Sequence, residues 1–300
     1  MAKARIAVVG AGLMGHGIAQ VFALAGHEVK ITDTVVKNLD TVASRIAANL
    51  RDLGEDERAV ERVQPSVDLT DAVHDADYVV EAVSENLELK KKIFAELERR
   101  TRPDTILASN TSVIPITAIM QDLSRRERAV GTHWWNPPFL VPLVEVIGTQ
   151  WTSPQVIATT MALHAAAGKT PAHVKKDVPG FIGNRLQHAL WREAISLVEH
   201  GICDAKTVDD VVKASFGRRL AVLGPIENAD QVGTDLTLAI HEVVLPAIES
   251  RPGPSPYLQE LVANGKLGFN SGEGFQKWSP EQQAALRARV MRHLKAMRDT

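Results

Sequence analysis

The sequence predicts an α/β protein in which a doubly wound parallel sheet is followed by an all-α C-terminal domain. In the first third of the chain, short runs rich in β-branched residues alternate with amphipathic helical segments, a pattern typical of a parallel sheet. From Asn184 onward the apolar residues follow a helical period, with no clear strand. A length of 300 residues also fits two domains. We place the boundary in "KKDVPGFIGN" (175–184), which gives domains 1–180 and 181–300.

The individual elements follow from local patterns, taken in chain order. The predicted strands are short runs rich in β-branched and apolar residues, and they cover 5–10, 28–33, 76–83 and 105–110. The first of them, "RIAVVG", has the composition of a strand that is buried on both faces. The predicted helices cover 15–26, which ends at Gly26, and then 86–101, 185–201 and 205–217. A last helix is predicted after Ser279, a candidate N-cap, with Pro280 at the first helical position.

Composition narrows the class of protein. A net charge of −2 provides no basic field for nucleic acid or for an anionic membrane surface. Cys203 is the single cysteine, so no internal disulfide is possible, and no His/Cys cluster suggests a metal site. The first strand begins almost at once, with no signal-peptide pattern, and no apolar run approaches the ~18 residues of a membrane span. We therefore expect a cytoplasmic protein that binds neither nucleic acid nor membranes.

A glycine-rich segment follows the first predicted strand. "VVGAGLMGHGIAQ" has the spacing GxGxxG at Gly10, Gly12 and Gly15. In a dinucleotide site the first glycine permits a tight turn, the second lets the backbone approach a pyrophosphate, and the third lets the helix pack on the strand. The spacing alone also fits an ordinary glycine-rich turn, but its position between a strand and a helix favours a Rossmann-type cofactor site. The candidate cofactor contacts in the loop include Leu13 and Met14 as well as the glycines.

Asp33 ends the second predicted strand, 18 residues after Gly15. A carboxylate at this place accepts hydrogen bonds from the ribose hydroxyls of the adenosine and repels a 2′-phosphate. The residues that follow, "TVV", include no arginine to neutralise that phosphate. The sequence therefore predicts NAD rather than NADP as the cofactor, although Asp33 is also compatible with a plain turn residue at a strand end.

An acid and a base occur in an otherwise apolar stretch, "GTHWWNPPFLVPLVEVIG" (131–148). His133 ends one predicted strand, and Glu145 lies in an alternating strand that returns after Pro137 and Pro138. Oxidation of an alcohol needs a base that works near neutral pH, and a neighbouring carboxylate fixes the tautomer of a histidine and stabilises its imidazolium. The pair is equally compatible with a core histidine and its partner, but a nicotinamide site in the same chain favours catalysis.

These motifs together resemble the L-3-hydroxyacyl-CoA dehydrogenase family, nearly from end to end. The similar segments are "GAGLMGHGIA", "EAVSENLELKKKIFAEL", "ASNTS", "GTHWWNPPFLVPLVEVI", "DVPGFIGNRL" and "KLGFNSGEGFQKW". The resemblance implies an NAD-dependent dehydrogenase whose helical domain also makes a homodimer contact. Within the family, "NPPFLVPLVE" and "SFGRRLAVLGP" are more similar to gulonate dehydrogenases, also found as lens crystallins, and to a pyridoxine-degradation dehydrogenase.

The resemblance also implies roles for individual residues. It makes His133 the base and Glu145 its orienting partner, with Ser112 and Asn184 as donors around the substrate oxygen. The residues that it places near the nicotinamide ribose and carboxamide are Glu85, Lys90 and Asn110. Read as plain structure, Ser112 and Asn184 are candidate helix caps. Because Ser112 follows a strand and Asn184 lies at the domain joint, we expect the substrate in a cleft between the domains.

The substrate class stays open between a CoA thioester and a free 3-hydroxy acid. Members that act on CoA thioesters carry a Lys-rich helical arm after the second strand, whereas this region has mixed charges, and "NTSV" replaces "NTSS". Arg218 and Arg219 are candidates to bind a free carboxylate, or are solvated surface residues. The candidate substrate-binding residues are Ser112, Asn136, Asn184, Arg218 and Arg219. A noncatalytic, crystallin-like NAD-binding protein is the alternative to an enzyme.

Overall fold

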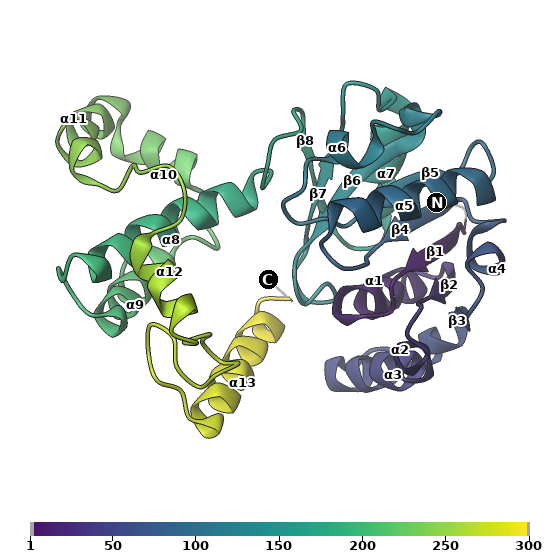
Figure 1. Cartoon of the computed structure of the whole chain (residues 1–300), viewed down its shortest axis with the longest axis horizontal. Coiled ribbons are helices and arrows are strands. Elements are labelled where there is room, and N and C mark those ends of the chain that lie inside the picture. The colour runs from purple at the N-terminus through teal and green to yellow at the C-terminus, as the bar shows by residue number, and fades with distance from the viewer. Residues whose placement is uncertain (1–2, 299–300) are drawn as a thin grey trace. The chain divides into compact units, whose positions relative to one another are not determined.

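A computed structural model gives the structure of residues 3–298, which form two compact units (Figure 1). The first unit contains the chain up to Arg185 together with the C-terminal stretch from His293. The second unit contains Leu186–Arg292. Across the residues that the structure describes, no helix combines the length and apolar character needed to cross a membrane.

An eight-stranded sheet organises the first unit, with the strand order β3-β2-β1-β4-β5-β6-β7-β8. Neighbouring strands are parallel except for the antiparallel pair of β6 and β7. The strands are β1 (Arg5–Val9), β2 (Glu28–Thr32), β3 (Val63–Ser66), β4 (Tyr78–Glu81), β5 (Ile106–Ser109), β6 (Ala129–Trp134), β7 (Leu143–Ile147) and β8 (Thr170–Val174). The chain winds outward from β1 through β2 to β3 and then returns to start the other half at β4, so the predicted doubly wound fold is confirmed.

Helices cover both faces of this sheet, because its central strands are apolar on both sides. Alternate residues of β1 point to opposite faces: Ile6 and Val8 join one core, and Ala7 and Val9 join the other. The first core includes side chains of α1 (Leu13–Leu24), α3 (Val42–Leu53) and α7 (Pro154–Ala166). The second includes side chains of α4 (Leu69–Val73), α5 (Leu87–Arg100) and α6 (Ile116–Met120). A short helix, α2 (Val36–Asp40), precedes α3.

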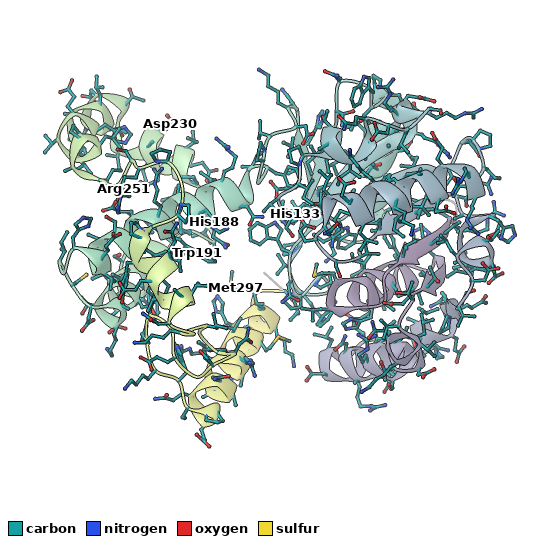
Figure 2. The ribbon with its side chains drawn as sticks, in the orientation of Figure 1. His133, His188, Trp191, Asp230, Arg251 and Met297 are labelled. Carbon is teal, nitrogen blue, oxygen red and sulfur yellow. The ribbon has the colours of Figure 1, made fainter. Side chains whose placement is uncertain are left out.

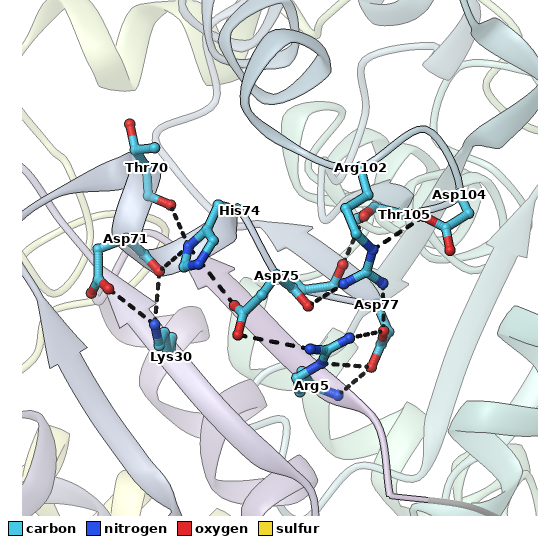
Figure 3. A network of polar contacts seen from close by, with 11 residues as sticks. Arg5, Lys30, Thr70, Asp71, His74, Asp75, Asp77, Arg102, Asp104 and Thr105 are labelled. Atoms are coloured by element: carbon cyan, nitrogen blue, oxygen red, sulfur yellow. Dashed lines mark hydrogen bonds and ion pairs between the residues drawn. The ribbon is translucent and has the colours of Figure 1, made fainter.

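Ion pairs connect the ends at which the strands begin (Figure 3). Asp77, just before β4, accepts from Arg5 Nη2 at 3.0 Å and from Arg102 Nη2 at 2.6 Å. Partial burial raises the pKa of Asp77, but the hydrogen bonds from the two arginines outweigh burial and lower it to about 2. Because ligands of such sheets bind at the carboxyl ends of the strands, this network lies at the opposite edge from the expected site.

The second unit is helical, as predicted. Its helices are α8 (Gly183–Glu199), whose first residues belong to the first unit, α9 (Ala205–Ala214), α10 (Pro225–Val232), α11 (Thr234–Val244), α12 (Pro256–Ala263) and α13 (Pro280–Ala296), whose end returns to the first unit. The predicted N-cap of the last helix is present, since Ser279 Oγ accepts from Gln282 N at 3.2 Å. In residues 186–292, all of which the structure describes, Leu261 is the one buried apolar side chain.

Candidate active site

The glycine loop lies between the ends of β1 and β4. Gly10 has φ +106°, and a Cβ there would lie 2.6 Å from the carbonyl oxygen of Ala82. A Cβ on Gly15 would lie 1.7 Å from the carbonyl oxygen of Gly10, so neither position has room for a side chain. A Cβ on Gly12, in contrast, would meet nothing within 4 Å. The loop is therefore closed toward the protein and open at Gly12, where a pyrophosphate needs to approach the backbone.

The same loop opens helix α1, with Gly12 at the N-cap and no acidic residue in the first turn. The N–H groups of Leu13, Met14 and Gly15 have no acceptor inside the helix because they belong to its first turn. Leu13 is exposed and Met14 is partly buried against the core. A helix N-terminus of this kind binds phosphate groups well, so the loop fits the pyrophosphate of a dinucleotide.

Asp33 follows β2 and is bonded to the glycine loop. Its Oδ2 accepts from Ala11 N at 2.7 Å and from Asn38 Nδ2 at 3.0 Å, and its Oδ1 accepts from Val35 N at 2.8 Å. The carboxylate therefore acts as the turn residue that the sequence allowed, and it also lies next to the loop. Its place at the carboxyl end of β2 is the one at which a ribose diol is bound in Rossmann-type domains.

His133 and Glu145 are directly opposite each other on the antiparallel strands β6 and β7. His133 Nδ1 donates to Glu145 Oε2 at 2.7 Å, and both side chains are almost completely buried. The imidazole lies between the rings of Trp135 and Phe181, at centroid distances of 5.2 and 5.6 Å. With Nδ1 bonded to the carboxylate, Nε2 is the nitrogen that can take a proton from an alcohol or return it to a carbonyl oxygen.

Glu145 has a second set of partners at the start of α8. Its Oε1 accepts from Ile182 N at 2.8 Å and from Gly183 N at 3.0 Å. Burial raises the pKa of this carboxyl, but the hydrogen bonds from His133 and from the two backbone N–H groups outweigh burial, so the pKa lies below its usual range. The carboxylate is therefore held in its charged form beside the imidazole.

Ser112 and Asn184 are adjacent, as the resemblance implied. Asn184 Nδ2 donates to the carbonyl oxygen of Ser112 at 2.8 Å. Neither residue is an N-cap, since α6 begins at Ile116 after Pro115 and α8 begins at Gly183. The two side chains are thus not accounted for by helix capping.

Glu85 fixes the loop that carries Ser112. Its Oε1 accepts from Thr111 Oγ1 at 2.5 Å, Ser112 N at 2.9 Å and Val113 N at 3.2 Å. Burial raises the pKa of Glu85, but these bonds and the charge of Lys90 outweigh burial and lower it. Glu85 therefore stays ionised and orders the loop beyond β5.

Lys90 lies beneath this loop, in contact with carboxylates. Its Nζ is 2.7 Å from Glu81 Oε1 and 3.4 Å from Glu85 Oε2, and its side chain has no exposed surface. Glu81 also accepts from Ser109 Oγ at 2.7 Å and from Val83 N at 2.8 Å. Glu81 was not among the residues predicted from the sequence, although a carboxylate that ends the apolar strand "YVVE" is a signal for a buried polar network.

The segment between His133 and Glu145 is anchored from two sides. Lys169 Nζ donates to the carbonyl oxygens of Pro138 and, at 3.1 Å, of Val141; burial lowers the pKa of Lys169 to about 8. Gly17 on α1 has no room for a side chain, because a Cβ there would lie 2.6 Å from Pro138 Cγ. Asn110 Oδ1 accepts from Trp134 N at 3.0 Å and so connects the end of β5 to β6.

The remaining candidates are exposed. Asn136 is exposed in the segment after β6. Arg218 ends the 3-10 helix Phe216–Arg218 of the second unit, and Arg219 follows it; both are exposed. The cofactor and acid–base candidates of the first unit therefore all lie on or around one sheet. The two arginines are surface residues of the second unit. Within residues 3–298, no group of three or more His, Cys, Asp or Glu side chains is arranged to hold a metal ion.

Comparison with known families gives two matches along the chain. Residues 5–178 match the NAD binding domain of 3-hydroxyacyl-CoA dehydrogenase, and residues 180–278 match the C-terminal domain of the same enzyme. The resemblance drawn from the motifs is thereby confirmed.

Individual relatives and solved structures extend the comparison. The chain is 37% identical over 298 residues to 5-formyl-3-hydroxy-2-methylpyridine 4-carboxylate 5-dehydrogenase of Mesorhizobium japonicum, covering 98% of this chain and 96% of the relative. It is 38% identical to the human mitochondrial hydroxyacyl-coenzyme A dehydrogenase, covering 91% and 90%. The solved structure of a 5-dehydrogenase of the first kind, described as an NAD+-dependent dismutase, has a TM-score of 0.92 at 36% identity, covering 99% of this chain and 97% of that one. That of a (S)-3-hydroxybutyryl-CoA dehydrogenase from Ralstonia eutropha has a TM-score of 0.76 at 34% identity, covering 93% and 100%.

Proposed function

Because the chain belongs to the 3-hydroxyacyl-CoA dehydrogenase family, we propose that its His133–Glu145 pair interconverts a 3-hydroxy and a 3-keto compound with NAD. The chain is an NAD-dependent oxidoreductase that acts on CH–OH groups, as the hydroxyacyl-coenzyme A dehydrogenases among its relatives do, so the noncatalytic alternative is set aside. The observation that carries the proposed mechanism is the buried hydrogen bond of 2.7 Å between His133 Nδ1 and Glu145 Oε2.

The proposed chemistry assigns each proton to a residue of this chain. Bound NAD+ supplies the acceptor for the hydride that leaves the hydroxyl-bearing carbon. His133 Nε2 takes the hydroxyl proton as the carbonyl forms, and Glu145 stabilises the resulting imidazolium. In the opposite direction His133 returns the proton to the carbonyl oxygen. Ser112 and Asn184 are proposed as the donors that hold this oxygen, since Asn184 Nδ2 lies 2.8 Å from the Ser112 carbonyl oxygen.

Cofactor contacts are part of the proposal. We assign the pyrophosphate to the glycine loop (Gly10, Gly12, Leu13, Met14 and Gly15) and the adenosine ribose to Asp33. Glu85 and Asn110 are proposed as contacts of the nicotinamide half. Lys90 has no exposed surface and is bonded to Glu81 and Glu85, which favours a role in which it holds Glu85 in place.

For the substrate we propose a hydroxy acid with a free carboxylate. The relative that acts on a pyridine carboxylate matches 98% of this chain, and its solved counterpart has the higher of the two TM-scores quoted above. The segment α2–α3, where thioester-specific members carry a Lys-rich arm, has one lysine, Lys37. A CoA thioester needs several cations for its phosphates, whereas a small acid needs one compact site such as Arg218 and Arg219.

A substrate screen tests the proposal. The holoenzyme is assayed with acetoacetyl-CoA, with free 3-hydroxy acids and with the pyridine carboxylate that gives the Mesorhizobium relative its name. We expect higher kcat/KM for a free acid than for acetoacetyl-CoA. Efficient turnover of the thioester, with none of the free acids oxidised, would contradict the proposal. The substrate would then be an acyl-CoA thioester, as the name of the human relative indicates for that enzyme.

Arginine variants locate the carboxylate site. Loss of a charge-assisted hydrogen bond costs about 1.5 to 3 kcal/mol, so R218A or R219A should raise KM roughly tenfold or more and change kcat less. R289A is the matched control, because Arg289 is an exposed arginine of α13. Kinetics of both arginine variants equal to those of the control would remove Arg218 and Arg219 from the site.

We also propose that the protein is a cytoplasmic homodimer with a domain boundary near residue 180, and that the helical part serves substrate binding and dimerisation. Support for the dimer comes from the second unit, in which large apolar side chains such as Val222, Ile226 and Val243 are at least 75% exposed. Trp191 on α8, which packs edge-on against His188, is 48% exposed (Figure 2). A second copy that covers these residues would complete the core that one copy lacks.

A further inference from the structure

A single arginine outside the predicted motifs contacts the glycine loop. Arg45 lies on α3, and its guanidinium donates to the carbonyl oxygens of Ala11 at 2.6 Å, Asn38 at 2.9 Å and Gly12 at 3.3 Å. Its Nε donates to Thr41 O at 3.4 Å. One side chain thus joins the α2–α3 segment to the loop that receives the cofactor. No sequence motif pointed to it.

The contacts with Ala11 and Gly12 have a consequence for the opposite side of the loop. In a trans peptide the C=O and the N–H of the same unit point in opposite directions. Fixing the carbonyl of Ala11 therefore orients the N–H of Gly12, and fixing the carbonyl of Gly12 orients the N–H of Leu13. These two N–H groups are at the helix start, where a pyrophosphate binds.

Asp33 holds the loop from the adjoining peptide unit. Its carboxylate accepts from Ala11 N at 2.7 Å, while Arg45 donates to Ala11 O at 2.6 Å. Successive peptide units of the loop are therefore clamped by an acid from β2 and a base from α3. The Gly12 carbonyl has two further partners in His16, whose Nδ1 lies 2.8 Å from Gly12 O and whose backbone N–H donates to it at 3.4 Å. The Ala11 carbonyl accepts its side-chain hydrogen bond from Arg45.

We propose that Arg45 is a positioning residue for the cofactor: it holds the glycine loop by its carbonyl face and so presents the Gly12 and Leu13 N–H groups to the pyrophosphate. Its positive charge, in a chain of net charge −2, also favours an anion at the loop. When the N–H donors are already oriented, less conformational entropy is lost as the cofactor binds. We therefore expect Arg45 to affect cofactor affinity and not the rate of hydride transfer.

The experiment compares three variants of the full-length enzyme by titration with NADH and with ADP-ribose in the absence of substrate. R45Q removes the positive charge and the planar guanidinium that donates to several carbonyls at once. R45K keeps the charge but cannot donate to several separate carbonyls in fixed directions. R51Q is the control, because Arg51 lies on the same helix, is exposed, and pairs with Glu57 at 2.7 Å. All titrations are run well below the melting temperature of each variant, so that only folded protein is compared.

We expect R45Q to weaken both ligands about tenfold, R45K to weaken them severalfold, and R51Q to match the parent. At saturating NAD, kcat of R45Q should stay within about twofold of the parent, which separates positioning of the cofactor from catalysis. A residue with a merely structural role would lower the melting temperature and leave the affinity of the folded enzyme unchanged. Parental NADH affinity in R45Q overturns the proposal; if R45Q does not fold, parental affinity in R45K does so.

Discussion

His133 and Glu145 work as a unit because each satisfies a requirement of the other. The imidazole needs an acceptor at Nδ1 to leave Nε2 free for the substrate, and the buried carboxylate needs donors to remain charged. Glu145 has three such donors: His133 Nδ1 and the backbone N–H groups of Ile182 and Gly183. A substitution at either residue therefore removes a hydrogen-bond partner of the other.

Replacing His133 with Gln should remove the general base and lower kcat by on the order of 10² to 10⁴ while NADH affinity stays near that of the parent. Steady-state kinetics and NADH titration measure the two effects. E145Q should lower turnover less than the His133 change. The amide oxygen of Gln can still accept from His133 Nδ1 or from the two backbone N–H groups, but not from both, so only part of the hydrogen bonding is lost. A His133 variant with parental turnover would contradict the mechanism.

Asp33 should determine the choice of cofactor. Its carboxylate is fixed by Ala11 N and Val35 N at the end of β2, so it cannot easily turn away from a 2′-phosphate. We expect kcat/KM with NADPH to be far below that with NADH when both are measured on the same substrate. Equal values for the two cofactors would mean that Asp33 does not face the ribose.

At the scale of elements, α7 brings a buried histidine against the sheet. His164 Nδ1 is 2.7 Å from Thr160 O, and its ring contacts Phe22, Tyr78 and Trp134 at centroid distances of 5.1 to 5.9 Å. Burial lowers the pKa of His164 to about 4; the hydrogen bond with Thr160 O opposes this and the charge of Lys169 adds to it. The folded state therefore holds this imidazole neutral.

The consequence is a pH dependence of stability with a defined sign. Between the unfolded pKa of about 6.5 and the folded pKa of about 4, the unfolded chain binds the extra proton, so stability is lost as the pH falls through this range. We expect the free energy of unfolding in urea to drop by roughly 2 kcal/mol from pH 7 to pH 5 on account of His164. H164Q should flatten this dependence, and H173Q, at an exposed position of β8, should not. An unchanged slope in H164Q would contradict the assignment.

Elements with a strong local pattern could be predicted from the sequence, and elements without one could not. The segments of β1, β4 and β5 are mostly apolar, and that of β2 ("EVKIT") alternates polar and apolar residues, so all four could be predicted as strands. The glycine loop could be predicted from its GxGxxG spacing, and the His133–Glu145 strands from an acid and a base in an apolar stretch. β3 ("VQPS") and β8 ("TPAHV") are the two edge strands, and each contains a proline. Their sequences have no strand pattern of their own, and they are strands because they pair with β2 and β7. Arg45 and Glu81 were not predicted because their partners are distant in the sequence. Arg45 binds Ala11, 34 residues away, and Glu81 binds Ser109, 28 residues away, so both contacts depend on the fold.

At the scale of the molecule, the second unit has little apolar core of its own, which is the basis of the proposed homodimer. Leu261 is its one buried apolar side chain within residues 186–292, while large apolar side chains of α8, α10 and α11 are exposed. We expect light scattering at micromolar concentration to give about twice the chain mass of 32.7 kDa. V243D, on α11, should shift the protein toward the monomer. V67D, equally exposed at 76% but in the first unit, is the control and should leave the dimer intact. A monomeric parent protein would rule out the dimer.

The register of β6 and β7 has a consequence for how this enzyme can diverge. Because His133 faces Glu145 across a backbone ladder, their separation is set by strand pairing and not by the residues that connect them. Substitutions in the connecting segment 135–142 therefore leave the paired positions of His133 and Glu145 on the two strands unchanged. Two enzymes of one lineage could thus differ in that segment and still share the same proton-transfer pair.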